Sequence, residues 1–134
     1  YIVPPEGADT LFVDTRAVYD DLSPAMKARI EGLVAEHDMF IALELTGVKF
    51  GYEKMRRMFP TMPYPLVRTS ASGRKTLYIG WHAIGIVGWP VPQAQELLDE
   101  LFHFAIQDKY IYAHKWRQGD MVVWDNRCTM HSAR

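Results

Sequence analysis

The residues best suited to chemistry lie near the carboxyl end of the chain. A turn at 119–120 precedes the apolar run 121–124, which is too short for a helix and rich in strand-forming residues. A polar turn at 125–127 leads into a second predicted strand, 128–131, which ends in His131. A neutral imidazole can bind a metal ion. A strand, a tight turn and a second strand ending in histidine would therefore present one metal ligand at the mouth of a small β-barrel.

Three segments of the chain carry motifs that belong together. Residues 4–14 read PPEGADTLFVD, residues 65–69 and 73–78 read PLVRT and GRKTLY, and residues 124–131 read WDNRCTMH. In this order they resemble motifs of the TauD/TfdA dioxygenases, which depend on Fe(II) and 2-oxoglutarate. The resemblance covers nearly the whole chain. It implies a mainly β fold with helical insertions, a double-stranded β-helix (jelly roll), here truncated at both ends.

The resemblance also implies a ligand set for iron. Two histidines and one carboxylate hold Fe(II) on one face and leave positions open for 2-oxoglutarate and O₂. In the family a His-x-Asp or His-x-Glu motif supplies two ligands and a distal histidine, matched by His131, supplies the third. None of the five histidines in this chain begins such a motif. We therefore expect the motif to lie ahead of residue 1, so that the chain is a fragment and inactive alone.

Four further residues gain possible roles from the resemblance. Thr10 matches a threonine that contacts a carboxylate of 2-oxoglutarate, and Trp124 matches a tryptophan near the iron. His82 matches a histidine of herbicide-degrading relatives and is a candidate for the substrate site. Ser70 stands where relatives frequently carry histidine, so this part of the substrate site is not copied unchanged. The arginine that grips 2-oxoglutarate lies well beyond the distal histidine in relatives, so Arg134 does not match it.

Each of these residues also has a structural interpretation. A lone histidine at a strand end is usually a surface or hydrogen-bonded residue. Thr10 in isolation is an ordinary strand threonine, and Trp124 suits a core position as well as a pocket wall. His82 is as well suited to a structural role as to substrate binding. If the site is real, Thr10, Trp124 and His131 must converge in the folded chain.

Short strands with helices between them would position these residues. Strands are predicted over 1–3, 10–13, 66–69, 76–79, 110–114, 121–124 and 128–131. Helices are predicted over 16–20, from Ser23 and Pro24 to about His37, and from Pro92 onward. Periodicity fades over 38–64, where we expect a lid-like insertion with a helical turn near 52–59. Many short strands suit a jelly-roll barrel better than alternating βαβ units.

Composition limits the remaining possibilities. The 134 residues suffice for one domain, 1–134, and 49% hydrophobic with 23% charged residues fits a globular chain. A net charge of −1 gives no electrostatic reason to expect nucleic acid or a membrane surface. No apolar run approaches the ~20 residues of a membrane span. No signal peptide is present, so we expect a cytoplasmic protein. Cys128, the one cysteine, is expected to be buried and inert.

The resulting functional prediction concerns the parent protein. The resemblance implies that it converts 2-oxoglutarate to succinate and CO₂ while hydroxylating a small molecule with O₂. The preferred substrate is an aryloxyalkanoate such as 2,4-dichlorophenoxyacetate, whose ether bond would be cleaved. Three alternatives stay open: a taurine or alkylsulfonate dioxygenase, a non-catalytic jelly-roll binding module, and a lone histidine on an unrelated sandwich. Relatives are often oligomeric, so the resemblance makes a homo-oligomer a possible state, although nothing in these residues shows one.

Overall fold

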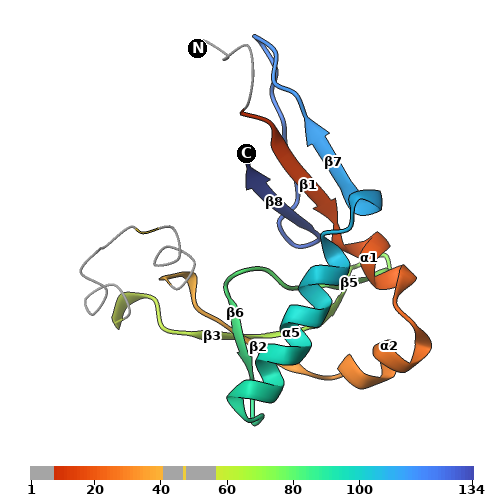
Figure 1. The fold of residues 1–134 in the computed structure, drawn as a ribbon, viewed down its shortest axis with the longest axis vertical. Helices are drawn as coiled ribbons and strands as arrows, with labels where there is room; N and C mark the ends of the chain where they lie inside the picture. Colours follow the sequence, from red (N-terminus) through yellow and green to blue (C-terminus); the bar gives the residue numbers. More distant parts are fainter. Residues whose placement is uncertain (1–7, 41–46, 48–56) are drawn as a thin grey trace.

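Short antiparallel strands and a long helix make up the described part of the chain, residues 8–40, 47 and 57–134 of the computed structural model (Figure 1). The strands are β1 (Thr10–Asp14), β2 (Val34–His37), β3 (Met62–Pro65), β4 (Val67–Thr69), β5 (Lys75–Leu77), β6 (Ala83–Ile86), β7 (Ile111–His114) and β8 (Thr129–Ala133). The helices are α1 (Thr15–Asp21), α2 (Pro24–Ile30), α5 (Val91–Ala105) and the 3₁₀ turn η1 (Asp108–Tyr110). The predicted mainly β arrangement with helices is therefore confirmed.

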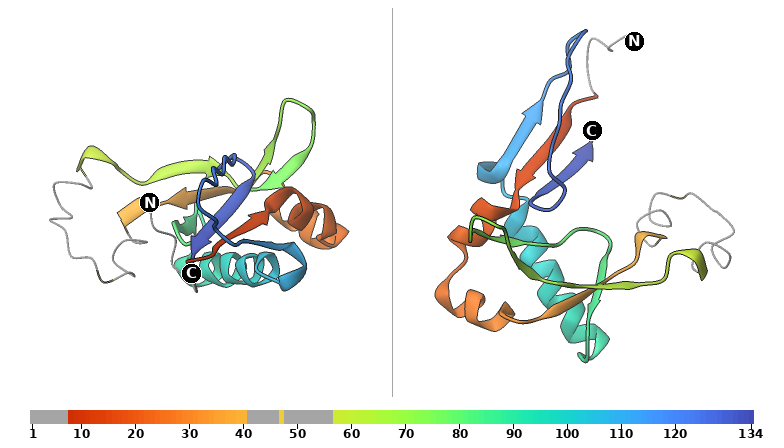
Figure 2. Two further views of the ribbon diagram at one scale, coloured as in Figure 1. Left: turned by 90° about the horizontal axis from the view of Figure 1, so that it is seen from above. Right: turned by 180° about the vertical axis from the view of Figure 1, so that it is seen from behind.

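The strands form three small sheets. One has the order β7-β1-β8, the second β3-β2-β6, and the third pairs β4 with β5. Every pairing is antiparallel. The first sheet stands apart from the other two at one end of the molecule (Figure 1, Figure 2). The predicted hairpin across 71–74 is confirmed: β4 and β5 are joined by a turn in which Gly73 has φ +81°.

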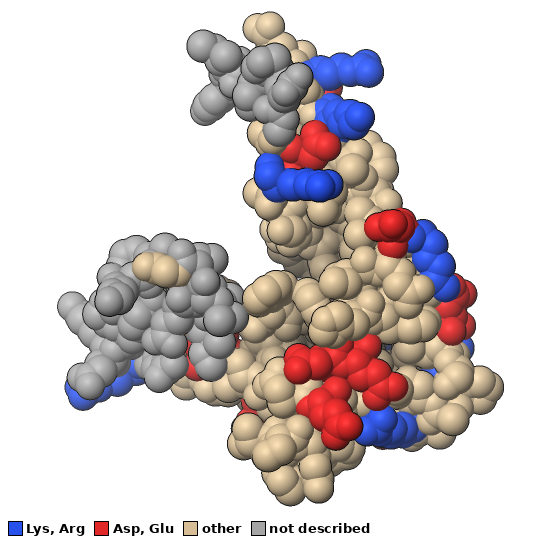
Figure 3. Space-filling model, viewed as in Figure 1, with Lys and Arg blue, Asp and Glu red and all other residues tan. Residues whose placement is uncertain are grey.

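The core lies between α5 and the strands that it crosses. The inward side of α5 is apolar, and Leu97 and Leu101 are fully buried in one cluster with Leu66 and Leu77. Burying such a side chain contributes about 1.5–3 kcal/mol, so this cluster dominates the stability of the unit. The exposed side of α5 carries acidic residues, and acidic side chains gather over this helix in the space-filling view (Figure 3).

Local signals explain where the first two helices begin. The Asp14 side chain caps α1 by accepting a hydrogen bond from the backbone N–H of Arg16. Ser23 caps α2 in the same way through Met26 N–H, and Pro24 occupies the first turn. The start of α2 agrees with the sequence prediction, whereas α1 begins at Thr15, one residue before the predicted range 16–20.

The predicted length of the second helix is wrong. The helix ends at Ile30, and Gly32 adopts φ +74°, a conformation that glycine reaches without a Cβ clash. Residues 34–37 then form β2, in which Ala35 and His37 are buried. The apolar residues that fitted a helical period are therefore divided between a helix and a strand.

The predicted strand over 121–124 is also wrong. These residues have no regular structure, and the side chains of Met121 and Val123 are 87% and 86% exposed. An apolar run needs a neighbouring strand to complete its hydrogen bonds, and the described part of the chain offers it none. The predicted strand 1–3 lies outside the described residues, as does most of the insertion 38–64 with its helical turn. None of the described helices meets the length and hydropathy that a bilayer crossing requires.

Candidate functional site

The pairing of β1 with β8 brings two predicted site residues onto one face of a sheet. In the antiparallel register Phe12 lies opposite His131, and Thr10 lies opposite Ala133. Side chains alternate between the two faces of a strand, and directly paired residues share a face. Thr10, Phe12 and His131 therefore point to the same side of the β7-β1-β8 sheet.

Three rings meet on this face. The ring centroids of Trp124 and His131 are 4.9 Å apart, and those of Phe12 and Trp124 are 5.3 Å apart. The Trp124 indole N–H donates a hydrogen bond to Asn126 Oδ1 at 2.7 Å, which fixes the direction of the ring. Trp124 and His131 are therefore in contact, as a shared site requires. Sequence reasoning missed Phe12, although its place two residues after Thr10 on a predicted strand was the available signal.

The hydroxyl of Thr10 already has one partner. Trp116 Nε1 lies 2.9 Å from Thr10 Oγ1. Because an indole can only donate, the threonine oxygen accepts this bond and its own proton is left to point elsewhere. A hydroxyl held in this way can donate to an anion such as a carboxylate. The contact spans more than a hundred residues of sequence, and nothing in the local pattern around Trp116 predicted it.

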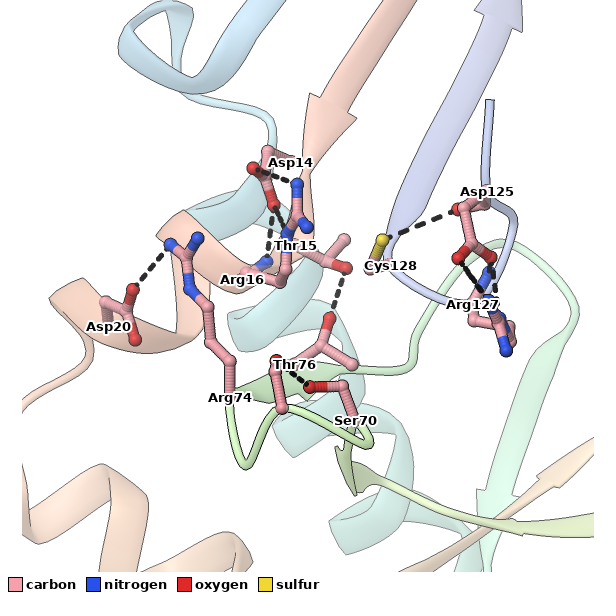
Figure 4. A network of polar contacts seen from close by, with 11 residues as sticks. Asp14, Thr15, Arg16, Asp20, Ser70, Arg74, Thr76, Asp125, Arg127 and Cys128 are labelled. Carbon is pink, nitrogen blue, oxygen red and sulfur yellow. Dashed lines mark hydrogen bonds and ion pairs between the residues drawn. The ribbon is translucent and has the colours of Figure 1, made fainter. Parts of the chain in front are cut away.

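A polar network fixes the turn that precedes β8 (Figure 4). The Arg127 guanidinium pairs with Asp125 at 2.8 Å and lowers the pKa of Asp125 to about 2. The backbone N–H of Thr15 donates to the carbonyl of Cys128 at 3.0 Å, which ties this turn to the start of α1. These contacts hold the turn before β8 in place and so help to position His131 on that strand.

The same network continues to the β4–β5 hairpin. The hydroxyls of Thr15 and Thr76 are 2.7 Å apart, and both side chains are buried. At the end of β1, burial raises the pKa of Asp14, but hydrogen bonds from Arg16 outweigh burial and the pKa is lowered overall. The Cys128 thiol lies at the edge of this network, 3.7 Å from the carbonyl of Asp125 (Figure 4). Cys128 is partly exposed, so its predicted burial is wrong.

A cleft of about 710 Å³ lies on the other side of β1. Its wall includes Leu11 and Val13 of β1, residues 77–82 after the start of β5, Phe102 of α5, and residues 129–132 of β8. His82 and His131 thus both border this cleft. Most of the wall is apolar, so the cleft suits a ligand with an apolar body.

Ser70 lies elsewhere. It is exposed in the turn between β4 and β5, where its hydroxyl is 2.8 Å from that of Ser72. Ser70 lines a separate cleft of about 390 Å³ together with Arg16, Arg74 and Arg127. Ser70 is therefore absent from the wall that His82 and His131 share.

His82 has a partner that the sequence did not indicate. His37 Nδ1 and His82 Nδ1 are 2.7 Å apart, and the two ring centroids are 4.9 Å apart. Burial, with the nearby charge of His82 as a smaller cause, lowers the pKa of His37 to about 4. Burial also lowers the pKa of His82. Both rings are therefore neutral near pH 7. No local pattern around His37 indicated this partner, which lies 45 residues away.

The described residues supply one candidate iron ligand rather than a complete set. His131 is exposed, and its imidazole contacts the rings of Phe12 and Trp124. No group of three or more His, Cys, Asp or Glu side chains that could hold a metal ion occurs within residues 8–40, 47 and 57–134. A facial triad needs three donors. The site therefore fits iron only if two further ligands join His131.

Comparisons with known proteins now bear on this site. A family model described as "Taurine catabolism dioxygenase TauD, TfdA family" matches residues 1–134. The chain is 46% identical over 134 residues to the alpha-ketoglutarate-dependent 2,4-dichlorophenoxyacetate dioxygenase of Burkholderia sp. (strain RASC), covering 99% of this chain and 45% of that protein. It is 38% identical to the (S)-phenoxypropionate/alpha-ketoglutarate-dioxygenase of Sphingobium herbicidovorans, covering 98% and 48%. The crystal structure of AAD-2 with Mn(II) and N-oxalylglycine superposes with a TM-score of 0.91 at 40% identity, covering 99% and 53%. The chain thus spans about half the length of these relatives.

Proposed function

Because the chain belongs to the TauD/TfdA family, we propose that it is part of an Fe(II)- and 2-oxoglutarate-dependent dioxygenase. The observation that carries this proposal is the β1–β8 register, which puts Thr10 and His131 on one sheet face with Trp124 against the histidine ring. The same register makes a lone histidine on an unrelated sandwich a poor alternative. The superposition on AAD-2 supports a jelly roll for the full-length protein. A lid role for 38–64 stays a prediction.

In this proposal His131 occupies one coordination position of the metal, and the other two protein ligands come from outside the described residues. Bound Fe(II) would combine O₂ with 2-oxoglutarate, releasing succinate and CO₂ and leaving the substrate hydroxylated. The residues of this chain shield the metal ligand and bind the cosubstrate. Trp124 and Phe12 pack beside the His131 ring and keep water from one side of it. Thr10, whose oxygen accepts the hydrogen bond from Trp116, donates a hydrogen bond to a carboxylate oxygen of 2-oxoglutarate.

The proposed substrate is an aryloxyalkanoate such as 2,4-dichlorophenoxyacetate. The relatives named above act on phenoxyacetate and phenoxypropionate compounds, as their names state. The cleft that residues 129–132 help to line has a mostly apolar wall, which suits an aromatic ring, and His82 adds a polar group to that wall. Hydroxylation of the carbon next to the ether oxygen gives a hemiacetal, which breaks into a phenol and a carbonyl compound.

Turnover by the full-length protein tests the proposal. The protein would be given Fe(II), 2-oxoglutarate, O₂ and, in separate reactions, 2,4-dichlorophenoxyacetate, (S)-phenoxypropionate or taurine. We expect succinate and a phenol in equal amounts with an aryloxy acid. Succinate with taurine alone would favour the alkylsulfonate alternative. No succinate with any substrate, from protein that is folded and metal-loaded, would favour a non-catalytic binding module.

A further inference from the structure

The buried partner of His82 has no role in the function proposed so far. His37 lies on β2, the central strand of the β3-β2-β6 sheet (Figure 1), and is 7% exposed. Its ring packs against Tyr64 of β3 and against Tyr78, with centroids 5.7 Å and 5.1 Å away. A polar side chain buried this deeply among rings needs a hydrogen bond to offset its lost hydration. The contact with His82 supplies that bond.

This contact restricts where the protons lie. Two neutral imidazoles whose Nδ1 atoms are 2.7 Å apart share one proton on that line, since one nitrogen must donate and the other accept. Only two arrangements satisfy this condition. Either His37 is protonated at Nδ1 and His82 at Nε2, or His82 is protonated at Nδ1 and His37 at Nε2.

The surroundings of the outer nitrogens favour the first arrangement. His37 Nε2 is buried and has no hydrogen-bond partner within the described residues. A proton there would be an orphaned buried donor, which is the rarer and costlier kind of unpaired group. His82 Nε2 instead lies over Gly80, 2.9 Å from the position that a Cβ of this glycine would take. Gly80 and His82 both line the 710 Å³ cleft, where a ligand can accept a hydrogen bond.

We propose that His37 is a positioning residue that donates a hydrogen bond from its Nδ1–H to His82 Nδ1 and so holds His82 as the Nε2–H form facing the cleft. His82 then offers a neutral N–H donor beside Gly80, where the missing side chain leaves room for the ring. Such a donor fits a carboxylate or another anionic end group, while Ile79 and Phe102 contact an apolar body. The assignment to the substrate rests on the proposed function; the proton arrangement does not.

The proton arrangement is tested first, by ¹⁵N NMR of the histidine rings in the full-length protein at pH 7. We expect His82 to carry its proton at Nε2 and His37 at Nδ1. His37→Asn retains an N–H donor near the Nδ1 position and should preserve the His82 signals. His37→Phe retains the ring but removes the donor, and should shift His82 toward a mixture of both forms. His103→Phe, on the exposed side of α5, is the matched control and should change neither ring.

The consequence for binding is tested by steady-state kinetics of the same variants. With His37→Phe we expect KM for the aryloxy acid to rise about tenfold, while kcat and KM for 2-oxoglutarate change less than about twofold; His37→Asn should restore the low KM. A wild-type His82 protonated at Nδ1 would overturn the proposal even if His37→Phe fails to fold. Unchanged His82 signals in a folded His37→Phe variant would also overturn it. If the expected tautomers appear but no aryloxy acid is turned over, the positioning role stands and the proposed function fails.

Discussion

The two histidine environments of this molecule differ in what they leave available. His131 is exposed on a sheet face beside two aromatic rings, so its imidazole is accessible to a metal. His37 and His82 instead each use Nδ1 in their mutual hydrogen bond. The His37 ring also packs against the rings of Tyr64 and Tyr78. His131 (the open imidazole) needs further metal ligands from outside the described residues. His37 and His82 (the closed pair) already satisfy each other by a hydrogen bond within the fold. Function should therefore respond most to changes at the first site, and stability to changes at the second.

The largest effect is expected from removing the open imidazole. In the full-length protein, His131→Ala should lower kcat/KM by at least about 100-fold, because losing even a residue that only hydrogen-bonds to a metal ligand costs about 10–100-fold. Its free energy of unfolding without metal should change by no more than about 0.5 kcal/mol, since the side chain is exposed. Succinate formation and urea unfolding measure the two quantities. Retained activity would remove His131 from the metal site.

The closed pair should make folding sensitive to acid. The pKa of His37 is lowered from 6.5 to about 4, so between these pH values the unfolded chain binds a proton that the folded chain does not. The free energy of unfolding should therefore fall as the pH falls through this window, by up to about 3 kcal/mol. His82 acts in the same direction. Urea unfolding of the metal-free protein at several pH values measures the slope, which His37→Phe should reduce and His131→Ala should not.

A smaller kinetic effect is expected at Thr10. Thr10→Val keeps the shape of the side chain and removes the hydroxyl, so KM for 2-oxoglutarate should rise about tenfold, as expected for losing a hydrogen bond to a charged group. KM for the aryloxy acid should stay unchanged. Initial rates at varied 2-oxoglutarate concentration measure the change. A normal KM for 2-oxoglutarate would leave Thr10 an ordinary strand residue.

The smallest effect sharpens the role of the polar network. Thr15→Val should cost about 1–2 kcal/mol of unfolding free energy, because it leaves the buried Thr76 hydroxyl without its partner. The double variant with Thr76→Val removes both hydroxyls and should be more stable than the single variant. Urea unfolding of both variants measures this. Equal losses in the single and double variants would mean that leaving the Thr76 hydroxyl unpaired costs nothing.

Local sequence patterns predicted much of the fold, but they failed for elements whose structure depends on contacts with distant parts of the chain. Ser23 with Pro24 marked a helix start, and the turn around Gly73 marked a hairpin, because the signal in each lies within a few residues. The end of the same helix was overestimated, since apolar spacing continued past Gly32 into a strand. The run 121–124 was misassigned because a strand exists only with a neighbour, and neighbours are not written in the local sequence.

The residues of the candidate site also separate into those that local sequence predicted and those that it did not. His131 and Trp124 could be named from one short motif, and their rings do meet. Trp116 could not, because it joins the site through a contact across most of the chain. Phe12 was missed although the alternation of the predicted strand places it on the same face as Thr10. His37 could not be named either, because the sequence prediction placed it at the end of a helix and its partner His82 lies 45 residues away. Site residues that share one short motif can be predicted from the sequence, whereas residues that meet only through long-range contacts cannot.

The alternation along β1 makes this strand intolerant of any change in length. Thr10 and Phe12 face the side that carries His131, while Leu11 and Val13 line the cleft. Deleting one residue within β1 ahead of Asp14 would exchange these two sets for part of the strand. If Phe12 or Val13 is deleted while Asp14 stays in place, Thr10 moves to the cleft side and Leu11 takes the place of Phe12 opposite His131. A hydroxyl would then enter the apolar wall and would be lost from the face that carries His131. One lost codon would thus damage cosubstrate binding and substrate binding together, although no functional side chain had been substituted.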